Sequence, residues 1–241
     1  MKALILAAGM GSRLAPLTDN YPKALIPVNG KPILVKQIEN LSGNGINDIT
    51  VIAGYKAEVL KKVISGLFPD VNIVINHDYL TTNNMYSAYL GRGPMGNDDF
   101  IMMNGDVFFD NSIIRTLRGH DSENAVVTDI GRYLEESMKV MSRKGRLAKI
   151  SKNIAKADAL GTSIDVYKLS CNGGKVFFDK CEMFIREKKQ LNLWSEVALE
   201  EIMSVIPFFA CPLDGRWIEI DNKDDLLKAE KMFADQVPLF I

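Results

Sequence analysis

Two glycines, an arginine and a lysine near the start of the chain have the residue types that hold phosphate groups. An apolar run at residues 4–8 is followed by Gly9, Gly11 and Arg13, and Lys23 comes ten residues later. Glycines let backbone N–H groups approach an anion closely, and arginine and lysine add a forked and a compact positive charge. The sequence predicts a phosphate-binding loop. The spacing matches neither G-x-G-x-x-G nor a Walker loop, so an ordinary glycine-rich turn stays an alternative.

The segments that must position these side chains alternate between strand and helix patterns. Continuous apolar runs predict buried strands at residues 4–8, 48–54, 72–76 and 99–106. Helical spacing of apolar residues predicts helices at residues 31–45, 57–68 and 83–90. This alternation predicts an α/β fold with a doubly wound, mostly parallel sheet, whose ligands bind where the strands end.

The second half of the chain changes character. Shorter strands are expected at residues 124–130, 137–142, 146–151, 159–169, 208–213 and 216–220, and helices at 173–188, 195–205 and 224–233. No repeat, low-complexity tract or Pro/Gly/Ser linker separates the halves. We therefore expect one domain over residues 1–241, in which the second half forms a lid or wall over the first.

Composition narrows the class of protein. Of 241 residues, 29 are basic and 30 acidic, so no polyanion-binding surface is indicated and nucleic-acid binding is disfavoured. The three cysteines, Cys171, Cys181 and Cys211, form neither a CxxC site nor a disulfide framework, which favours a reducing compartment. No run approaches the length of a membrane span, and the N-terminus lacks a signal-peptide pattern. We expect a soluble, cytoplasmic protein.

Three segments together resemble the nucleotidyltransferase family that activates sugar phosphates and small phospho-alcohols. They are LILAAGMGSRLAPLT, PKALIPVNGKPIL and the Gly-Asp pair that ends the strand at 99–106. The resemblance implies a Rossmann-like sheet, with a nucleotide-binding half at 1–110 and an acceptor-binding half at 111–241. It implies a reaction of a nucleoside triphosphate with a phosphate monoester, giving a nucleoside-diphosphate-linked product and pyrophosphate.

The resemblance also implies roles for individual residues. Arg13 and Lys23 would be catalytic, and Asp106 and Asp221 would hold Mg²⁺, a cation that prefers carboxylate and phosphate oxygens. The residues implied for nucleotide binding are Leu6, Ala7, Ala8, Gly9, Met10, Gly11, Ser12, Arg13, Lys23, Thr82, Asn83, Asn84, Ser87, Gly105 and Asp106. As alternatives, Asp106 caps a turn and Asp221 is the N-cap of the last helix.

The segment DYLTTNNMYSAYL at 78–90 is similar to one in small cytidylyltransferases that make CDP-choline and CDP-aminoethylphosphonate. The amides of Asn83 and Asn84 offer both a donor and an acceptor to a pyrimidine edge. A helix N-cap with a polar first turn is the other interpretation, and both can hold at once. The Glu-Lys-Pro typical of sugar enzymes is absent, although Lys152 remains to meet an acceptor phosphate. The closing stretch GRWIEIDNKDDLLKAE also resembles the choline-type group.

A cationic acceptor would need a carboxylate or an aromatic face. The candidates for acceptor binding, besides Lys152, are Asp129, Glu136, Trp194 and Glu196. Asp129 ends a predicted strand that would aim it at the cleft, whereas Glu136 is also explained as a solvated loop residue and Trp194 as a hydrophobic staple. Because no aromatic cage is evident, an aminoalkyl phosphate or phosphonate is as good a candidate as phosphocholine.

The leading hypothesis is Mg²⁺-dependent transfer of CMP from CTP to a small phosphate or phosphonate acceptor. One alternative is a sugar-1-phosphate nucleotidyltransferase that uses UTP, dTTP or GTP. Another is a nucleotide-binding regulatory domain without turnover. The sequence leaves open a monomer or a homodimer, since the apolar tail at 236–241 can pack within the chain or against a partner.

Overall fold

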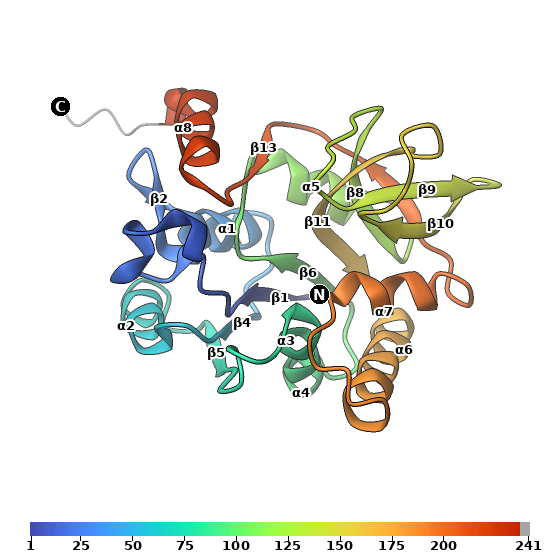
Figure 1. Cartoon of the computed structure of the whole chain (residues 1–241), viewed down its shortest axis with the longest axis horizontal. Helices are drawn as coiled ribbons and strands as arrows, with labels where there is room; N and C mark the ends of the chain where they lie inside the picture. Colours follow the sequence, from blue (N-terminus) through green and yellow to red (C-terminus); the bar gives the residue numbers. More distant parts are fainter. Residues whose placement is uncertain (237–241) are drawn as a thin grey trace.

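The computed structural model describes residues 1–236. They form a nine-stranded sheet with helices packed on both of its faces (Figure 1). Its strands run in the order β10-β9-β11-β6-β1-β4-β5, and β8 pairs with both β11 and β12. The strands are β1 (Lys2–Ala7), β4 (Ile49–Ala53), β5 (Asn72–Ile75), β6 (Phe100–Asn104), β8 (Ala125–Ile130), β9 (Lys139–Arg143), β10 (Arg146–Ser151), β11 (Gly161–Leu169) and β12 (Phe209–Pro212). The apolar tail at 236–241, apart from its first residue, lies outside the described residues.

The first half of the sheet is parallel and covered on both faces. β1 pairs in parallel with β4 and β6, and β4 with β5. Apolar side chains of α1, α2 and α5 pack on one face, and those of α3, α4, α6 and α7 on the other. These helices are α1 (Ile33–Ser42), α2 (Ala57–Leu67), α3 (Asn84–Leu90), α4 (Arg92–Met95), α5 (Ser112–Gly119), α6 (Cys171–Glu182) and α7 (Ser195–Ile202). The predicted doubly wound α/β fold is confirmed.

The second half joins the same sheet through antiparallel pairs. β11 lies antiparallel to β6 and also pairs with β8 and β9. Its pairing with β8 shifts register between Ser163 and Tyr167, at a point where Asp165 has a left-handed backbone with φ +58°. A bulge of this kind re-aims a side chain, and here it affects a residue of the functional cavity.

Two short strands hold acidic residues together, and the sequence analysis predicted only the second of them, at residues 216–220. β7 (Val107–Phe109) lies antiparallel to β13 (Trp217–Glu219), with Val107 opposite Glu219. The backbone N–H of Ile220 then donates to the Asp106 carbonyl at 3.0 Å. This pairing joins the end of β6 to a segment more than a hundred residues later. Because β7 has three residues and its partner is remote, local patterning gives no signal for it.

The N-caps of two helices bear on the alternative interpretations of Asp221 and Asn83. Asn222, not Asp221, caps α8 (Lys223–Met232), because its side chain accepts from the N–H of Asp225. The interpretation of Asp221 as the N-cap is therefore wrong, and its carboxylate is available to the site. Asn83 is the N-cap of α3 and accepts from the N–H of Asn84. The remaining short elements are the β2–β3 hairpin (Pro27–Val28 and Lys31–Pro32) and single helical turns at Ser12–Leu14, Leu17–Asp19, Lys23–Leu25, Met183–Glu187 and Ala234–Gln236.

Among residues 1–236, no helix has both the length and the apolar character needed to cross a membrane.

Candidate active site

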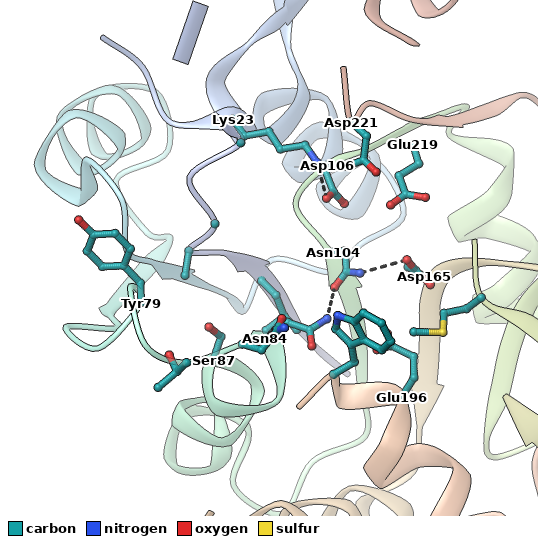
Figure 2. Close-up of a pocket in the computed structure, with 18 of the residues that line it drawn as sticks. Lys23, Tyr79, Asn84, Ser87, Asn104, Asp106, Asp165, Glu196, Glu219 and Asp221 are labelled. Atoms are coloured by element: carbon teal, nitrogen blue, oxygen red, sulfur yellow. Dashed lines mark hydrogen bonds and ion pairs between the residues drawn. The ribbon is translucent and has the colours of Figure 1, made fainter. Parts of the chain in front are cut away.

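A cavity of about 360 Å³ opens where the parallel strands end (Figure 2). Its walls come from the loop after β1, from the segment between β5 and α3, and from the residues that follow β6. Side chains of β11, α7 and β13 line it as well. This is the edge of an α/β sheet at which ligands are expected to bind.

The loop after β1 depends on Gly11. Its backbone has φ +64°, and a Cβ added there would lie 2.7 Å from Cβ of Lys23. Only a glycine accepts both this left-handed conformation and the close approach. The loop is thus shaped to bring Lys23 beside it, and Arg13 follows in the helical turn Ser12–Leu14.

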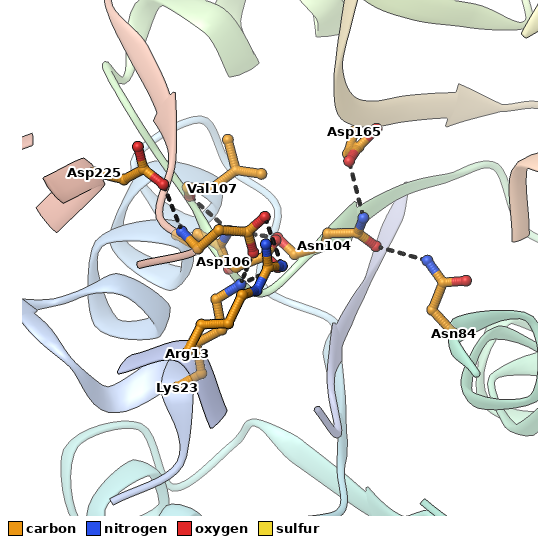
Figure 3. A network of polar contacts seen from close by, with 10 residues as sticks. Arg13, Lys23, Asn84, Asn104, Asp106, Val107, Asp165 and Asp225 are labelled. Carbon is orange, nitrogen blue, oxygen red and sulfur yellow. Dashed lines mark hydrogen bonds and ion pairs between the residues drawn. The ribbon is translucent and has the colours of Figure 1, made fainter. Parts of the chain in front are cut away.

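Lys23 is the centre of a charged cluster (Figure 3). Its Nζ lies 2.8 Å from Oδ2 of Asp106 and 2.7 Å from Oδ1 of Asp221, and Arg13 lies 2.9 Å from Oδ2 of Asp221. Burial by itself would lower the pKa of Lys23, but the two carboxylates outweigh it and hold that pKa above its ordinary value. Burial likewise opposes ionisation of Asp221, but Lys23 and Arg13 hold its pKa below the usual range.

Glu219 adds a third carboxylate, which the sequence analysis did not assign. Oxygens of Asp106, Glu219 and Asp221 lie within 4.8 Å of one another. Burial, together with the charges of Asp106 and Asp221, raises the pKa of Glu219 to about 7. The available signal was the spacing of two residues between Glu219 and Asp221, which puts neighbouring strand side chains on one face.

The three carboxylates suit a divalent cation such as Mg²⁺. Hard cations of this kind prefer carboxylate oxygens. Oδ1 of Asp106 is buried and has no hydrogen-bond partner among the described residues. The pKa of Glu219 is raised in part because the negative charges of Asp106 and Asp221 outweigh the positive charge of Lys23 at this site. These observations fit the predicted use of Asp106 and Asp221 and add Glu219.

A second group of polar side chains lies between β5 and α3. Asn76 is buried, and its amide donates to Thr82 Oγ1 and to Ser87 Oγ at 3.1 Å each. Asn84 donates to Asn104 Oδ1 at 3.4 Å and accepts from the N–H of Ser195 at 2.8 Å. Because these contacts fix its amide, Asn84 is held rigidly at the cavity wall.

A buried acidic pair lines another part of the cavity. The hydroxyl of Tyr167 lies 2.9 Å from Oδ1 of Asp165 and 2.8 Å from Oε1 of Glu196. Asn104 donates to Oδ2 of Asp165 at 3.1 Å, as Figures 2 and 3 show. Burial raises the pKa of both carboxyls, and for Asp165 the charge of Glu196 raises it further. The sequence analysis assigned Glu196 but not Asp165.

Lys152 and Trp194 meet at the cavity wall. The Nζ of Lys152 lies 5.0 Å from the centroid of the Trp194 ring, and Trp194 is 44% exposed. Trp194 immediately precedes α7. Both predicted acceptor residues therefore line the cavity.

Asp129 and Glu136, predicted for acceptor binding, are not among the described residues that line this cavity. Oδ2 of Asp129 accepts from Nε1 of Trp217 at 2.9 Å and pairs with Arg132 at 3.1 Å. β8 ends on the side of β11 away from β6, so the expectation that Asp129 is aimed into the cleft is wrong. Glu136 is exposed, as the solvated-loop alternative has it, and its neighbours Ser137 and Met138 line the cavity instead.

The other predicted residues divide into two sets. Those that line the cavity are Leu6, Ala8, Gly9, Gly11, Ser12, Arg13, Lys23, Thr82, Asn83, Asn84, Ser87, Asp106, Lys152, Trp194, Glu196 and Asp221. Ala7, Met10 and Gly105 adjoin it in sequence without lining it. A Cβ on Gly105 would lie 2.9 Å from the Leu6 carbonyl, so this glycine permits close packing of the backbone. Lining residues without an assigned role in the sequence analysis are Asn76, Tyr79, Asn104, Ser137, Met138, Asp165 and Glu219.

Comparison with known proteins gives consistent matches. Residues 2–138 match the family described as nucleotidyl transferase. A choline-phosphate cytidylyltransferase from Streptococcus pneumoniae is 37% identical over 190 residues, which are 69% of this chain and 81% of that protein. A CMP-5'-(3-aminopropyl)phosphonate synthase from Streptomyces rubellomurinus is 34% identical over 128 residues, 52% of this chain and 20% of that protein.

Solved structures of cytidylyltransferases and of sugar-phosphate enzymes share the fold. The CTP:phosphocholine cytidylyltransferase from Streptococcus pneumoniae superimposes with a TM-score of 0.80 and 25% sequence identity. The superposition covers 96% of this chain and 98% of that one. An inositol-1-phosphate CTP transferase from T. maritima shares the fold, with a TM-score of 0.76 over 98% of this chain and 97% of that one, at 20% identity.

Proposed function

We propose that this chain, which belongs to the nucleotidyl transferase family, transfers CMP from CTP to a small phosphate or phosphonate acceptor and releases pyrophosphate. One observation carries the proposal. A single cavity combines the charged cluster of Arg13, Lys23 and three carboxylates with an amide and hydroxyl wall beside α3, in a chain similar to cytidylyltransferases.

The chemistry needs charge neutralisation and positioning more than a general base. An oxygen of the acceptor, already an anion at neutral pH, attacks the α-phosphorus of CTP. The new P–O bond forms as the bond to the bridging oxygen breaks, and the electron pair leaves with pyrophosphate. Lys23 offsets the charge that develops at the α-phosphate, and Arg13 holds the leaving group. This account explains why no histidine is needed in the cavity.

We propose that Asp106, Glu219 and Asp221 hold Mg²⁺. When bound, the cation supplies positive charge to phosphate oxygens. Lys23 donates to both Asp106 and Asp221, so it fixes their positions relative to each other, and it holds the pKa of Asp221 below the usual range. Ionised carboxylates in a fixed arrangement are the state that a divalent cation requires.

The wall between β5 and α3 is proposed to bind the nucleoside. Asn76 ties Thr82 and Ser87 together, so the polar atoms near the cavity have fixed directions. Asn83 and Asn84 add amides, which match the donor and acceptor pattern of a pyrimidine. This arrangement supports CTP as the nucleotide.

The acceptor is proposed to bind on the side of the cavity formed by the second half of the chain. Lys152 would contact its phosphate, and Trp194 and Glu196 would contact the rest of the molecule. Residues 1–110 then serve mainly the nucleotide and 111–241 the acceptor, within one working unit. Glu219 and Asp221 are exceptions, because they come from the second half of the chain but belong to the charged cluster. The three free cysteines support a cytoplasmic location.

The test is pyrophosphate release with Mg²⁺, crossing four nucleoside triphosphates with a panel of acceptors. The panel holds phosphocholine, phosphoethanolamine, 2-aminoethylphosphonate, glycerol phosphate, inositol-1-phosphate, glucose-1-phosphate and mannose-1-phosphate. Turnover that requires CTP and a small non-sugar acceptor is the expected result. Turnover of a sugar phosphate with UTP, dTTP or GTP would support the sugar enzyme instead. Nucleotide binding without any turnover would support a regulatory domain.

A further inference from the structure

We propose that the acceptor carries an ammonium group with at least one N–H bond, which donates to the free carboxylate oxygen of Glu196. This inference rests on the proposed function and narrows its acceptor. It concerns the part of the cavity where Glu196 and Asp165 lie, away from Lys23 (Figure 2).

Among residues 1–236, one oxygen of Glu196 accepts no hydrogen bond of ordinary length and angle, although the side chains of Ser195 and Asn84 lie close to this carboxylate. The residue is 2% exposed, and Oε1 accepts the hydroxyl of Tyr167 at 2.8 Å. Oε2 is buried and has no hydrogen-bond partner among the described residues. An unpaired buried carboxylate oxygen costs free energy. Because Glu196 lines the cavity, a ligand bound there can supply the missing donor.

The negative charge of the Asp165–Glu196 pair favours a cation as this ligand. The Tyr167 hydroxyl has one proton but lies within hydrogen-bond distance of both Asp165 and Glu196. It can donate to only one of the two carboxylates. Burial raises the pKa of both carboxyls, and the charge of Glu196 raises that of Asp165 further, so a nearby positive charge would stabilise their ionised forms. An ammonium group brings the positive charge and the donor together.

Asp165 differs from Glu196 in being satisfied by the protein. Its Oδ2 accepts from Asn104 at 3.1 Å, and its Oδ1 faces Tyr167. Asp165 therefore adds negative charge and holds Tyr167 in place, while Glu196 contacts the ammonium group directly. One carboxylate oxygen is available, which suits one N–H donor.

A quaternary ammonium fits this wall poorly. It has no N–H to give to Glu196, and it is bound in proteins by several aromatic faces. Among the described residues that line the cavity, the aromatic ones are Tyr79 and Trp194. Tyr79 packs edge-on against Tyr55, and Trp194 already faces the cation of Lys152. No aromatic cage forms from the described residues of the cavity.

The experiment is a methylation series at saturating CTP and Mg²⁺. The acceptors are 2-aminoethyl phosphate, its N-methyl and N,N-dimethyl derivatives, and phosphocholine, which offer three, two, one and no N–H bonds. Ethyl phosphate, which lacks the ammonium group, is the comparison. In the wild-type protein, kcat/KM is expected to fall most at the last methylation, and ethyl phosphate to be at least about tenfold poorer than 2-aminoethyl phosphate.

Variants assign the effect to Glu196. Glu196→Gln is expected to reduce the preference for 2-aminoethyl phosphate over ethyl phosphate by about 10- to 100-fold. Glu201→Gln is the matched control, since it removes the same charge from the same helix at an exposed pair with Lys180 and should keep the preference. A ratio between two acceptors is not moved by a general loss of folded protein.

Three results would overturn the inference and leave the proposed function standing. They are phosphocholine turned over as well as 2-aminoethyl phosphate, ethyl phosphate turned over equally well, and an unchanged preference in a folded Glu196→Gln. If Glu196→Gln does not fold, the wild-type methylation series decides alone. Absence of CTP-dependent turnover with every acceptor of the full panel would overturn both proposals.

Discussion

Replacing Lys23 by Met removes the one lysine charge that bridges two carboxylates of the site. The side chain of Lys23 is 12% exposed, and those of Asp106 and Asp221 are 24% and 25% exposed. The methionine keeps most of the volume, so the change isolates the charge. Asp106, Glu219 and Asp221 then repel one another with Arg13 as the remaining cation of the cluster.

The cost follows from the partial burial of the cluster. Removing one partner of a fully buried ion pair costs about 3–5 kcal/mol. Because each carboxylate here keeps about a quarter of its exposure, we expect about 2–3 kcal/mol at pH 7.5. Turnover should fall at least about 100-fold, the range found when one group that stabilises transition-state charge is lost.

The pH dependence has a defined sign. Lys23 holds the pKa of Asp221 below its ordinary value, so its contribution is present above the unfolded pKa of about 3.9 and is lost as the pH falls through the folded pKa. The stability difference between Lys23→Met and wild type should therefore stay near its full size from neutral pH down to about pH 5 and shrink as the pH falls below about 4. Added Mg²⁺ should stabilise the variant more than the wild type.

Urea unfolding at several pH values and steady-state turnover measure these effects. Lys31→Met is the matched control, because the pair of Lys31 with Glu39 is exposed and should contribute less than about 1 kcal/mol. A Lys23→Met protein that is as stable as the wild type at pH 7.5, or that keeps a tenth of its turnover, would refute the reasoning.

Three further predictions concern other parts of the molecule. Burial opposes ionisation of Asp110, but Arg216 outweighs it and lowers the pKa of this carboxyl. Asp110→Asn should therefore cost about 1 kcal/mol at pH 7, and urea unfolding should show this cost falling as the pH drops below about 4. Gly11→Ala should cost about 1–2 kcal/mol in thermal unfolding and lower turnover about tenfold, because the new Cβ displaces Lys23; unchanged turnover would contradict the role given to the loop. Lys152→Met should raise the KM of the acceptor about tenfold and that of CTP less than twofold in steady-state kinetics, and equal effects on both would argue against an acceptor contact.

The first half of the chain was predictable because its signals are local. The four parallel strands are short apolar runs, and α1, α2 and α3 have regular apolar spacing, so these elements were found within a few residues of their observed ends. The short helix α4 and the β2–β3 hairpin were not predicted. The loop with Gly11 and Arg13 follows β1 directly. Because the residues of this loop are close in sequence, their relative positions depend little on remote segments.

The acidic residues of the second half were harder to assign because their placement depends on remote pairing. Glu219 joins Asp106 only through the pairing of β7 with β13. Asp165 turns into the cavity at a bulge in β11, which alternation along a regular strand does not reveal. Asp129 shows the converse: a strand end was visible in the sequence, but which neighbour that strand would take was not.

Product analysis tests the central claim most directly. Wild-type protein and Asp106→Asn would be incubated with CTP, Mg²⁺ and 2-aminoethyl phosphate, and the products identified by mass spectrometry. We predict a CDP-linked product and pyrophosphate in equal amounts from the wild type, and neither from a folded Asp106→Asn. Release of CMP without a CDP-linked product, or the same product from Asp106→Asn, would contradict the transfer of CMP at this cavity.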